Sequence, residues 1–393
     1  MDIQWRGIKI SFILVSLSFG VISFLLPIYS KEMGLSATQI GGMFSVFSFV
    51  LLIIKPLIGR WTDKIGWKWF LVVAMGLYGV AFYLLAYATS SWMLYIVRMT
   101  QAIGSAFLSI ASYSMVVALS GEGEVGKQLG KVQSTQSLGM MIGTTVSITV
   151  FFNMPFFEAW HKLFVFFAVM AAVGGLIICL RVKDNVKVPT SKDKIKLKIK
   201  YSKPLIGMFL ITFIFALCSS MLSPILMVYL QDYFTKDLMQ LSWAFFPSAM
   251  IYIVLGSKLG YLGDRYGYKK MMVIGTLMNC MVAFLIPFTA FLIPLSILWC
   301  IDAIGDIIEG TSKSAFLAQI VEEDMRGRVY GICGSIGSLG AMIGPIFGGV
   351  LYDKISVHVP FYINGVGCLI VCALIFLLLG KEKQVYENEV HLI

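Results

Sequence analysis

The sequence contains few charged residues for its length. Only 13% of the 393 residues are Asp, Glu, Lys or Arg, whereas 58% are hydrophobic. A chain with this balance cannot hide its apolar side chains inside a single soluble core. The composition therefore excludes a soluble globular protein and indicates one that is embedded in a membrane.

The sequence also lacks the patterns that carry catalysis or metal binding. It has three isolated histidines, and seven cysteines that form no C-x-x-C pair and have no neighbouring histidine. We interpret the cysteines as small buried side chains. Because no phosphate loop and no nucleophile beside a base are present either, we expect no enzyme, no metal and no cofactor, and a proton gradient as the source of energy. The histidines are His161, His358 and His391, and the cysteines are Cys179, Cys218, Cys280, Cys300, Cys333, Cys368 and Cys372.

Long apolar runs dominate what is present. Crossing a bilayer takes roughly 20 apolar residues, and twelve runs meet that length, so we predict an all-α membrane protein with twelve transmembrane helices. The first run is too long for a signal peptide and no small-x-small cleavage site follows it, so we interpret it as a spanning helix. The runs cover residues 8–30, 38–60, 67–89, 91–119, 127–152, 160–181, 204–231, 238–262, 268–290, 293–320, 328–352 and 358–380.

Basic residues gather in alternate connections between these runs, as at 60–68 and 326–328. The positive-inside rule then places these connections and both termini in the cytoplasm of a multi-pass cell-membrane protein. These loops account for the net charge of +10, and no basic stripe with interleaved aromatics lies outside them, so nucleic acid is not an expected partner. The expected partners are the lipid bilayer, protons and a small-molecule substrate, and we expect a monomer.

One long polar stretch, rich in lysine, interrupts the apolar pattern at residues 182–203. It predicts a basic cytoplasmic linker between two six-helix bundles, at 1–181 and 204–380, with a cytoplasmic tail at 381–393. We favour a solvated loop over a partner-binding motif for this linker.

A short charged phrase occurs once in each half, as GRWTDKIGWK at 59–68 and GYLGDRYGYK at 260–269. Its aspartates are 264 − 63 = 201 residues apart, and the same offset relates AIG at 102–104 to AIG at 303–305. A duplicated chain with parallel repeats is typical of transporters. We predict that the phrase forms a cytoplasmic gate, because glycines permit tight turns and basic residues can bond to the last carbonyls of a neighbouring helix. The gate residues are Gly59, Asp63, Lys64, Gly66, Lys68, Gly260, Asp264, Arg265, Gly267 and Lys269.

In these features the chain resembles the major facilitator superfamily over essentially its whole length, and most of all the twelve-helix drug:proton antiporter branch. The repeated phrase resembles the loop signature of that family. Arg98 and Gln101, in VRMTQAIGSAF, resemble its R-x-x-Q-G signature. The resemblance implies a fold of two six-helix pseudo-repeats, and it assigns the arginine to proton coupling or to a network between helices.

The segment GAMIGPIFGG at 340–349 resembles a glycine–proline signature of drug:proton antiporters. In the family that signature stands on the fifth helix, where this chain has GMMIGTT without the proline; the full version stands on the eleventh predicted helix. We therefore interpret it as a close-packed, bendable helix seam and not as evidence for antiport. The seam residues are Gly340, Gly344, Pro345, Gly348 and Gly349.

The tenth run carries four charged residues at spacings of 4, 3 and 4. Such spacing places them within roughly 60° of one helix face, so we predict a polar stripe that faces a water-filled central cavity. Three carboxylates in a desolvated place cannot all ionise easily, and we expect one to hold a proton, with Asp306 preferred because it is near mid-helix. For Glu309 and Lys313 a self-neutralising i,i+4 pair is an equal alternative. The candidate residues are Asp302, Asp306, Glu309, Lys313 and the neighbouring Trp299.

Together these features predict proton-coupled efflux of small organic molecules, amphipathic or cationic, by alternating access, with the binding cavity between the halves. The first helix contains no acidic residue, so coupling would use the tenth helix. Two alternatives remain open. One is a proton symporter or facilitator for a sugar or other metabolite, in which Lys313 and Arg98 hold a polar or anionic solute. The other is a membrane sensor that does not transport.

Overall fold

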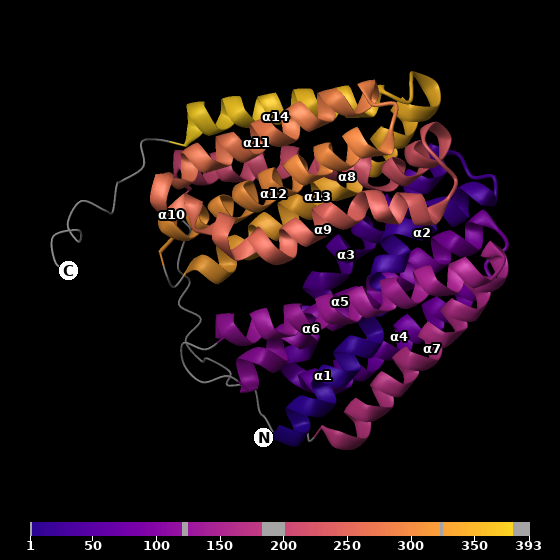
Figure 1. Ribbon diagram of the computed structural model, residues 1–393. Helices are drawn as coiled ribbons and strands as arrows, with labels where there is room; N and C mark the ends of the chain where they lie inside the picture. The colour runs from indigo at the N-terminus through magenta and orange to yellow at the C-terminus, as the bar shows by residue number, and fades with distance from the viewer. Residues whose placement is uncertain (1, 120–124, 183–200, 323–324, 380–393) are drawn as a thin grey trace. The chain divides into compact units, whose positions relative to one another are not determined.

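The computed structural model describes residues 2–119, 125–182, 201–322 and 325–379, and within these ranges every regular element is a helix (Figure 1). The predicted all-α fold is therefore confirmed. The chain divides into two compact units, Met1–Ile195 and Lys196–Ile393. Most of the predicted linker and the whole of the predicted tail lie outside the described residues, so the domain boundaries stay a prediction.

Each unit is a bundle of long helices with short connections. The helices of the first unit are α1 (Asp2–Ser16), α2 (Phe19–Glu32), α3 (Ala37–Ile65), α4 (Trp67–Ala86), α5 (Ser91–Leu119), α6 (Val125–Asn153) and α7 (Phe156–Arg181). The helices of the second unit are α8 (Lys203–Tyr233), α9 (Leu238–Gly260), α10 (Leu262–Tyr266), α11 (Tyr268–Leu285), the 3-10 turn η1 (Ile286–Phe288), α12 (Leu292–Ile320), α13 (Arg326–Lys354) and α14 (Val359–Leu378).

Eleven segments within the described residues are long and apolar enough to cross a membrane, and α1 and α2 together form the first of them. Helix α12 is not among the eleven, although its 29 residues are sufficient in length. The reason is its four charged side chains, which lie in the part of the helix that would cross the bilayer. The twelve predicted spans are thus eleven apolar segments and one helix with a polar stripe.

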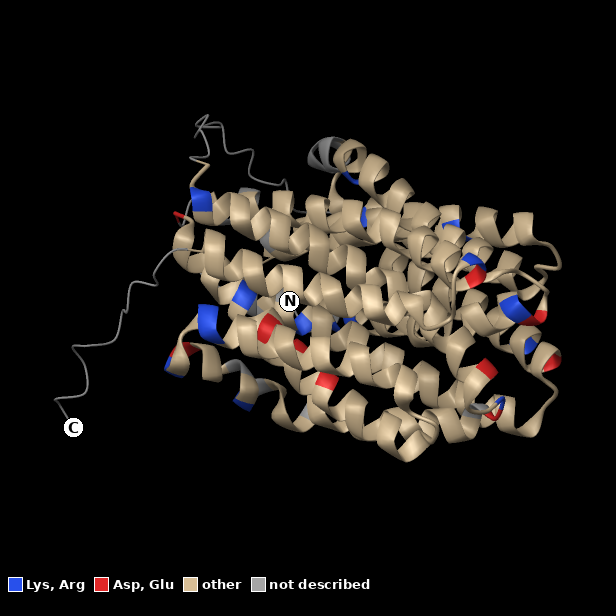
Figure 2. Cartoon of the chain, turned by 90° about the horizontal axis from the view of Figure 1, so that it is seen from above, with Lys and Arg blue, Asp and Glu red and all other residues tan. Residues whose placement is uncertain are grey.

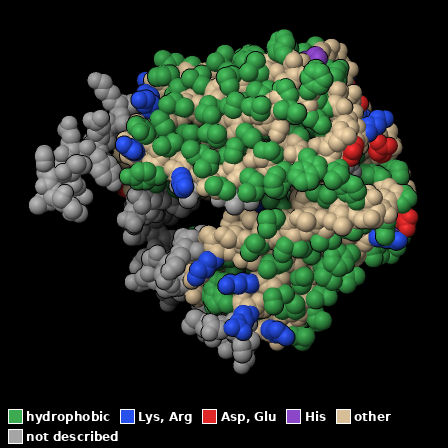
Figure 3. Space-filling view, in the orientation of Figure 1, with side chains coloured by type: hydrophobic (Ala, Val, Ile, Leu, Met, Phe, Trp, Pro, Cys, Tyr) green, Lys and Arg blue, Asp and Glu red, His purple; other side chains and the backbone are tan. Residues whose placement is uncertain are grey.

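The outer surfaces of both units are suited to lipid. Large apolar side chains such as Trp92 and Phe288 are 78% and 76% exposed, and hydrophobic side chains cover most of the face in Figure 3. Many of the charged residues lie near the ends of the helices, and few interrupt their middle parts (Figure 2). This is the distribution expected when the bilayer, and not water, surrounds the middle of each bundle.

The first predicted span is interrupted, whereas the sequence predicts one continuous helix at 8–30. Helix α1 ends at Ser16 and α2 begins at Phe19. At this break α6 approaches so closely that a Cβ added to Gly143 would overlap the carbonyl oxygen of Leu17. The break therefore coincides with a backbone contact between helices that only glycine allows, and no proline is needed to explain it.

The helix boundaries repeat with the offset found in the sequence. Helices α5 and α12 both have 29 residues, and their ends are related by 292 − 91 = 201 and 320 − 119 = 201. Helices α6 and α13 agree in the same way, with 326 − 125 = 201 and 354 − 153 = 201. The duplication thus extends from short motifs to the length and register of whole helices.

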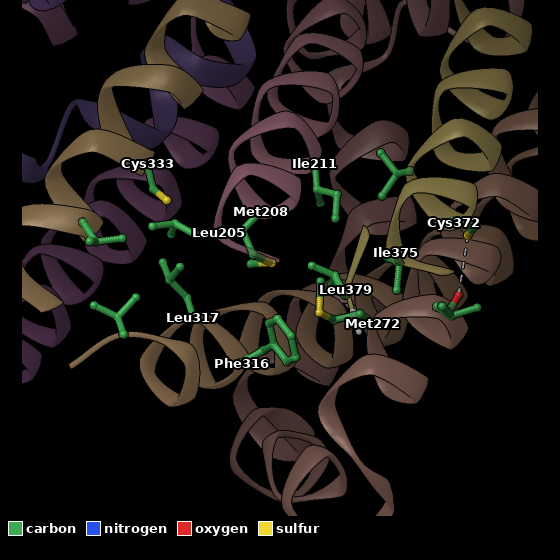
Figure 4. Close-up of a cluster of buried hydrophobic side chains, with 14 of the residues drawn as sticks. Leu205, Met208, Ile211, Met272, Phe316, Leu317, Cys333, Cys372, Ile375 and Leu379 are labelled. Atoms are coloured by element: carbon green, nitrogen blue, oxygen red, sulfur yellow. Dashed lines mark hydrogen bonds between the residues drawn. The ribbon is translucent and has the colours of Figure 1, made fainter. Parts of the chain in front are cut away.

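The second unit is densely packed at one end. Side chains from α8, α11, α12, α13 and α14 meet there in one hydrophobic cluster (Figure 4). Met208, Met272 and Ile375 in this cluster are 0% exposed, and Phe316 of α12 is 3% exposed. This cluster packs α12 against four neighbouring helices near the repeated phrase, and so holds the rest of α12 in a defined orientation.

Candidate functional site

Asp306 on α12 is held by donors from two other helices. The hydroxyl of Tyr252 on α9 donates to its Oδ2 at 3.0 Å, and Nδ2 of Asn279 on α11 donates to its Oδ1 at 2.8 Å. Each carboxylate oxygen therefore accepts one hydrogen bond from a neutral group. This arrangement fixes the orientation of the carboxylate without supplying a positive charge.

Asp302 lies one helical turn before Asp306 and has a different environment. Its carboxylate makes no hydrogen bond or ion pair with any described residue, and it lines a cavity of about 230 Å³. Residues of the second unit alone form the cavity, from α8, α11, η1, α12 and α14, and Asp306 and Asn279 are among them. Two carboxylates of the predicted stripe therefore share one cavity.

Glu309 and Lys313 form the self-neutralising pair that was the alternative in the sequence. Lys313 Nζ lies 2.9 Å from Oε1 and 3.1 Å from Oε2 of Glu309, whose side chain is 2% exposed. The ammonium group also lies 4.4 Å from the ring centroid of Phe215 on α8. Because Lys313 is used in this pair, Asp302 and Asp306 have no cationic partner in the described part of the chain.

Trp299 completes the site on α12. Its ring stacks on Phe245 of α9, with the ring centroids 3.9 Å apart and the planes inclined by 11°, and it also lines the cavity. An aromatic wall and the carboxylate of Asp302 thus line the same cavity.

Arg98 on α5 is buried inside the first unit and is only 6% exposed. Its guanidinium carbon lies 4.5 and 4.4 Å from the ring centroids of Phe44 and Phe47 on α3, and it donates to Oε1 of Gln101 at 3.0 Å. Among the described residues Nε of Arg98 and Nε2 of Gln101 have no hydrogen-bond partner. Within that part of the chain the guanidinium group is therefore stabilised by two rings and one amide, and not by a carboxylate.

The two polar sites occupy equivalent positions of the repeat. The 201-residue offset relates Arg98 to Trp299 and Gln101 to Asp302, and it relates the stacking ring Phe44 to Phe245. Equivalent positions of the repeated helices thus carry a polar site, which is basic in the first unit and acidic in the second.

The two donors to Asp306 were not among the residues predicted from the sequence. A signal for Asn279 was present, because it is a polar residue inside the apolar run of α11. Tyr252 gave no signal, since an aromatic residue in an apolar run is ordinary.

The repeated phrase has the same backbone geometry in both units. Gly66 follows the last residue of α3 and Gly267 follows the last residue of α10. Their φ angles are +93° and +91°, a region that essentially only glycine adopts. In the second unit Lys269 Nζ donates to the carbonyl of Leu379 at 2.6 Å, and the hydroxyl of Tyr268 donates to Asp264 at 2.6 Å. Lys269 therefore satisfies a carbonyl at the end of α14, which is the kind of contact predicted for the basic residues, but it forms within one unit.

The other phrase residues have less defined surroundings. Lys68 Nζ lies 5.3 Å from the ring centroid of Trp69, and Arg265 stacks similarly on Tyr266 with its guanidinium carbon 5.3 Å from the ring centroid. The side chains of Asp63 and Lys64 lie outside the described part of the structure, as do the surroundings of Gly59 and Gly260. Their role in a gate stays a prediction.

The seam glycines of α13 lie against the backbone of α8. A Cβ added to Gly340 would come within 2.6 Å of the Phe213 carbonyl oxygen, and one added to Gly348 within 2.5 Å of the Met221 carbonyl oxygen. At Gly344 the added atom would overlap the carbonyl oxygen of Leu217. Pro345 and Gly349 are buried in the same helix. The glycines thus permit two helices to pack with almost no space between their backbones.

The sequence is similar to those of known membrane proteins. The family model described as Major Facilitator Superfamily matches residues 9–207 and 208–391. Multidrug resistance protein 1 of Bacillus subtilis (strain 168) is 23% identical over 370 residues, which cover 91% of this chain and 92% of that protein. Quinolone resistance protein NorA of Staphylococcus aureus (strain MSSA476) is 22% identical, with 94% of both chains covered.

A solved structure shares the fold. The crystal structure of the nucleoside transporter NupG superposes with a TM-score of 0.74 and 14% identity, covering 97% of this chain and 100% of that one. At this identity the likeness concerns the arrangement of the helices alone.

Proposed function

The chain belongs to the Major Facilitator Superfamily, and we propose that it exports small organic molecules, amphipathic or cationic, in exchange for protons by alternating access. It is a membrane transporter and not an enzyme. Efflux is supported by relatives named for multidrug and quinolone resistance, which match this chain over nearly its full length.

The observation that carries the proposal is the environment of Asp306. Its two hydrogen-bond donors, Tyr252 and Asn279, are neutral, and no cation fixes it in the ionised form within the described residues. A tyrosine hydroxyl can donate to a carboxylate and can equally accept from a carboxylic acid, while the amide can bond to the other oxygen in both states. The site therefore tolerates both protonation states of Asp306, as a proton carrier requires.

In the proposed cycle a proton from outside neutralises Asp306, and its release to the cytoplasm follows the change of conformation. Since Glu309 and Lys313 already neutralise each other, they are not assigned a proton. The repeated phrase acts near the ends of the helices, where Lys269 bonds to the end of α14. We place both termini and the phrase in the cytoplasm because basic residues gather there, and we propose a monomer as the working unit.

Proton flux into proteoliposomes with an internal pH dye tests the proposal. Lipophilic cations, anionic metabolites and sugars are added in turn to the wild type and to Asp306→Asn. The matched control is Glu158→Gln, which removes an exposed carboxylate paired with Lys162 in the first unit. We expect lipophilic cations to evoke a pH change that is absent in Asp306→Asn and intact in the control.

Other outcomes select the alternatives. Normal, equally pH-dependent transport by Asp306→Asn would remove Asp306 from the mechanism. Movement of a labelled solute without any pH response would make the protein a facilitator. If no solute moves down an imposed gradient, the chain is a membrane sensor that keeps the transporter fold.

A further inference from the structure

Two arginines of the first unit lie on neighbouring helices, where α1 begins and α7 ends. The hydroxyl of Ser11 on α1 donates to the carbonyl of Gly174 on α7 at 2.8 Å. One turn earlier on α1, a Cβ added to Gly7 would lie 3.5 Å from Cβ of Arg181 on α7. Arg6 directly precedes this glycine, and both arginines are exposed. Two positive charges therefore share this end of the unit.

Helix α6 brings a third cation to the same level. A Cβ added to Gly139 of α6 would lie 2.5 Å from the carbonyl oxygen of Ile13 on α1. One turn further along both helices, a Cβ added to Gly143 would overlap the backbone of Leu17. The helices thus run parallel, with a register of 139 − 13 = 126. This register places the exposed Lys131 opposite position 131 − 126 = 5 of α1, next to the arginine of that helix.

These three cations have no acidic partner in the first unit as far as the structure describes it. Arg6, Lys131 and Arg181 form no side-chain hydrogen bond or ion pair with a described residue. The acidic side chains described in this unit are Glu32, at the end of α2, and Glu158, at the start of α7. Since Arg181 ends α7, Glu158 lies about 35 Å away, well beyond a Debye length of about 10 Å. The stretch that follows, 182–203, contains eight lysines and two aspartates and so adds positive charge.

Large apolar side chains continue from these cations toward the middle of the bundle. Ile10 lies four residues after the arginine of α1, Leu138 lies seven residues after the lysine of α6, and Leu180 precedes the arginine of α7. Their side chains are 42%, 49% and 74% exposed. Spacings of four and seven keep side chains on one face of a helix. Figure 3 shows Lys and Arg side chains gathered at the end of the first unit where the chain begins, beside hydrophobic ones. This surface is therefore basic at its edge and apolar further in.

An anionic phospholipid matches both parts of this surface. Its phosphate accepts charge-assisted hydrogen bonds from arginine and lysine, and arginine can bind it through two N–H groups at once. Its acyl chains cover the apolar side chains that follow. A soluble phosphate would leave those side chains uncovered, and a zwitterionic lipid would bring its own ammonium group next to three cations. Basic sites between helices at the cytoplasmic side are the places where anionic headgroups bind.

We propose that Arg6, Lys131 and Arg181 bind the phosphate of an anionic phospholipid in the leaflet at this end of the bundle, with an acyl chain along the apolar side chains beside them. The proposal goes beyond the proposed function, because it concerns the surrounding lipid and depends neither on the solute nor on protons. The repeat does not provide the same three cations in the second unit, since the counterpart of Lys131, at 131 + 201 = 332, is Ile332.

Photo-crosslinking locates the lipid. The full-length protein is placed in phosphatidylcholine nanodiscs with a small share of phosphatidylglycerol that carries a diazirine on one acyl chain, and crosslinked peptides are identified by mass spectrometry. Crosslinks are expected in the first half of α1 and the adjoining parts of α6 and α7, at a higher yield than on the second unit. Unlabelled phosphatidylglycerol is expected to compete for them. Phosphatidylcholine and water-soluble glycerol phosphate are expected not to compete.

The double variant Arg6→Gln with Arg181→Gln tests the role of charge. One cation near the membrane surface corresponds to about fivefold in affinity for an anionic lipid, so the loss of two is expected to weaken binding by roughly thirtyfold. The matched control is Lys258→Gln, which removes an exposed cation from the last turn of α9 in the second unit. The control is expected to crosslink at these sites as the wild type does.

Three results would each overturn the proposal. They are equal crosslinking by a phosphatidylcholine probe at this surface, unchanged crosslinking in the double variant, and competition by glycerol phosphate. If the double variant does not fold, the competition series on the wild type decides.

Discussion

Replacement of glycine by alanine is expected to have opposite effects on stability at two positions of α13, the helix whose seam glycines pack against α8. At Gly344 an added Cβ overlaps the carbonyl oxygen of Leu217, and the nearest nitrogen, that of Met221, is 3.0 Å away. At Gly334 on the same helix nothing lies within 4 Å of an added Cβ. Alanine at both positions therefore changes the helix propensity equally but the packing at only one.

The magnitudes follow from these contacts. Gly→Ala inside a helix gains about 0.5–1 kcal/mol from propensity, so Gly334→Ala is expected to be neutral or slightly stabilising. At Gly344 the atoms that must yield belong to the backbone of α8, and overpacking of this kind costs about 1–3 kcal/mol or more. We expect Gly344→Ala to be less stable than Gly334→Ala by about 1–3 kcal/mol.

Unfolding in mixed detergent micelles with increasing dodecyl sulfate, followed by circular dichroism, measures this difference. Both variants are compared with the wild type under the same conditions. Equal stability of the two variants, or a stabilised Gly344→Ala, would refute the close backbone contact between α8 and α13.

Three further predictions concern the repeated phrase and the polar stripe. Gly267→Ala is expected to destabilise the protein by about 1–3 kcal/mol, because the φ angle of +91° at this position suits only glycine. The micelle unfolding experiment measures this, and an unchanged stability would contradict the left-handed backbone conformation at Gly267. Lys269→Met is expected to speed hydrogen exchange in the last turn of α14, because the variant loses the hydrogen bond to the carbonyl of Leu379. Exchange in α12 is expected to stay unchanged, and mass spectrometry follows both helices. Exchange in α14 equal to that of the wild type would contradict this contact. Glu309→Gln is expected to destabilise the protein by about 1–3 kcal/mol, since it removes the counter-charge of the half-buried Lys313 ammonium group. The double variant Glu309→Gln with Lys313→Met is expected to recover most of this loss, and a double variant no better than the single one would disprove the pairing.

The sequence predicts the architecture closely because the chain is duplicated and its spans are long. A fixed offset constrains the ends of α5 and α12 together, and the turn at Gly66 must recur at Gly267. The acidic stripe was equally visible, because charged residues inside an apolar run stand out. These features depend on neighbours within one helix or on a repeated spacing.

What the sequence did not predict depends on contacts between distant segments. The partners of Asp306 come from residues 54 and 27 positions away, on two other helices. The cavity arises where side chains of α8, α11, α12 and α14 leave space between these helices. The break after Ser16 needs the approach of Gly143 from α6. None of these leaves a periodic pattern that a single sequence displays.

Helix α12 has a consequence for how the protein enters its membrane. Insertion through a translocon costs roughly 2.5–3.5 kcal/mol for one Asp or Lys at the centre of a helix, and α12 carries Asp302, Asp306, Glu309 and Lys313. Its preceding helix α11 supplies Asn279 to Asp306 and packs backbone to backbone at Gly275 and Gly305. We infer that α11 and α12 insert together as a hairpin, so that the helix with the four charged side chains depends on its neighbour from synthesis onward.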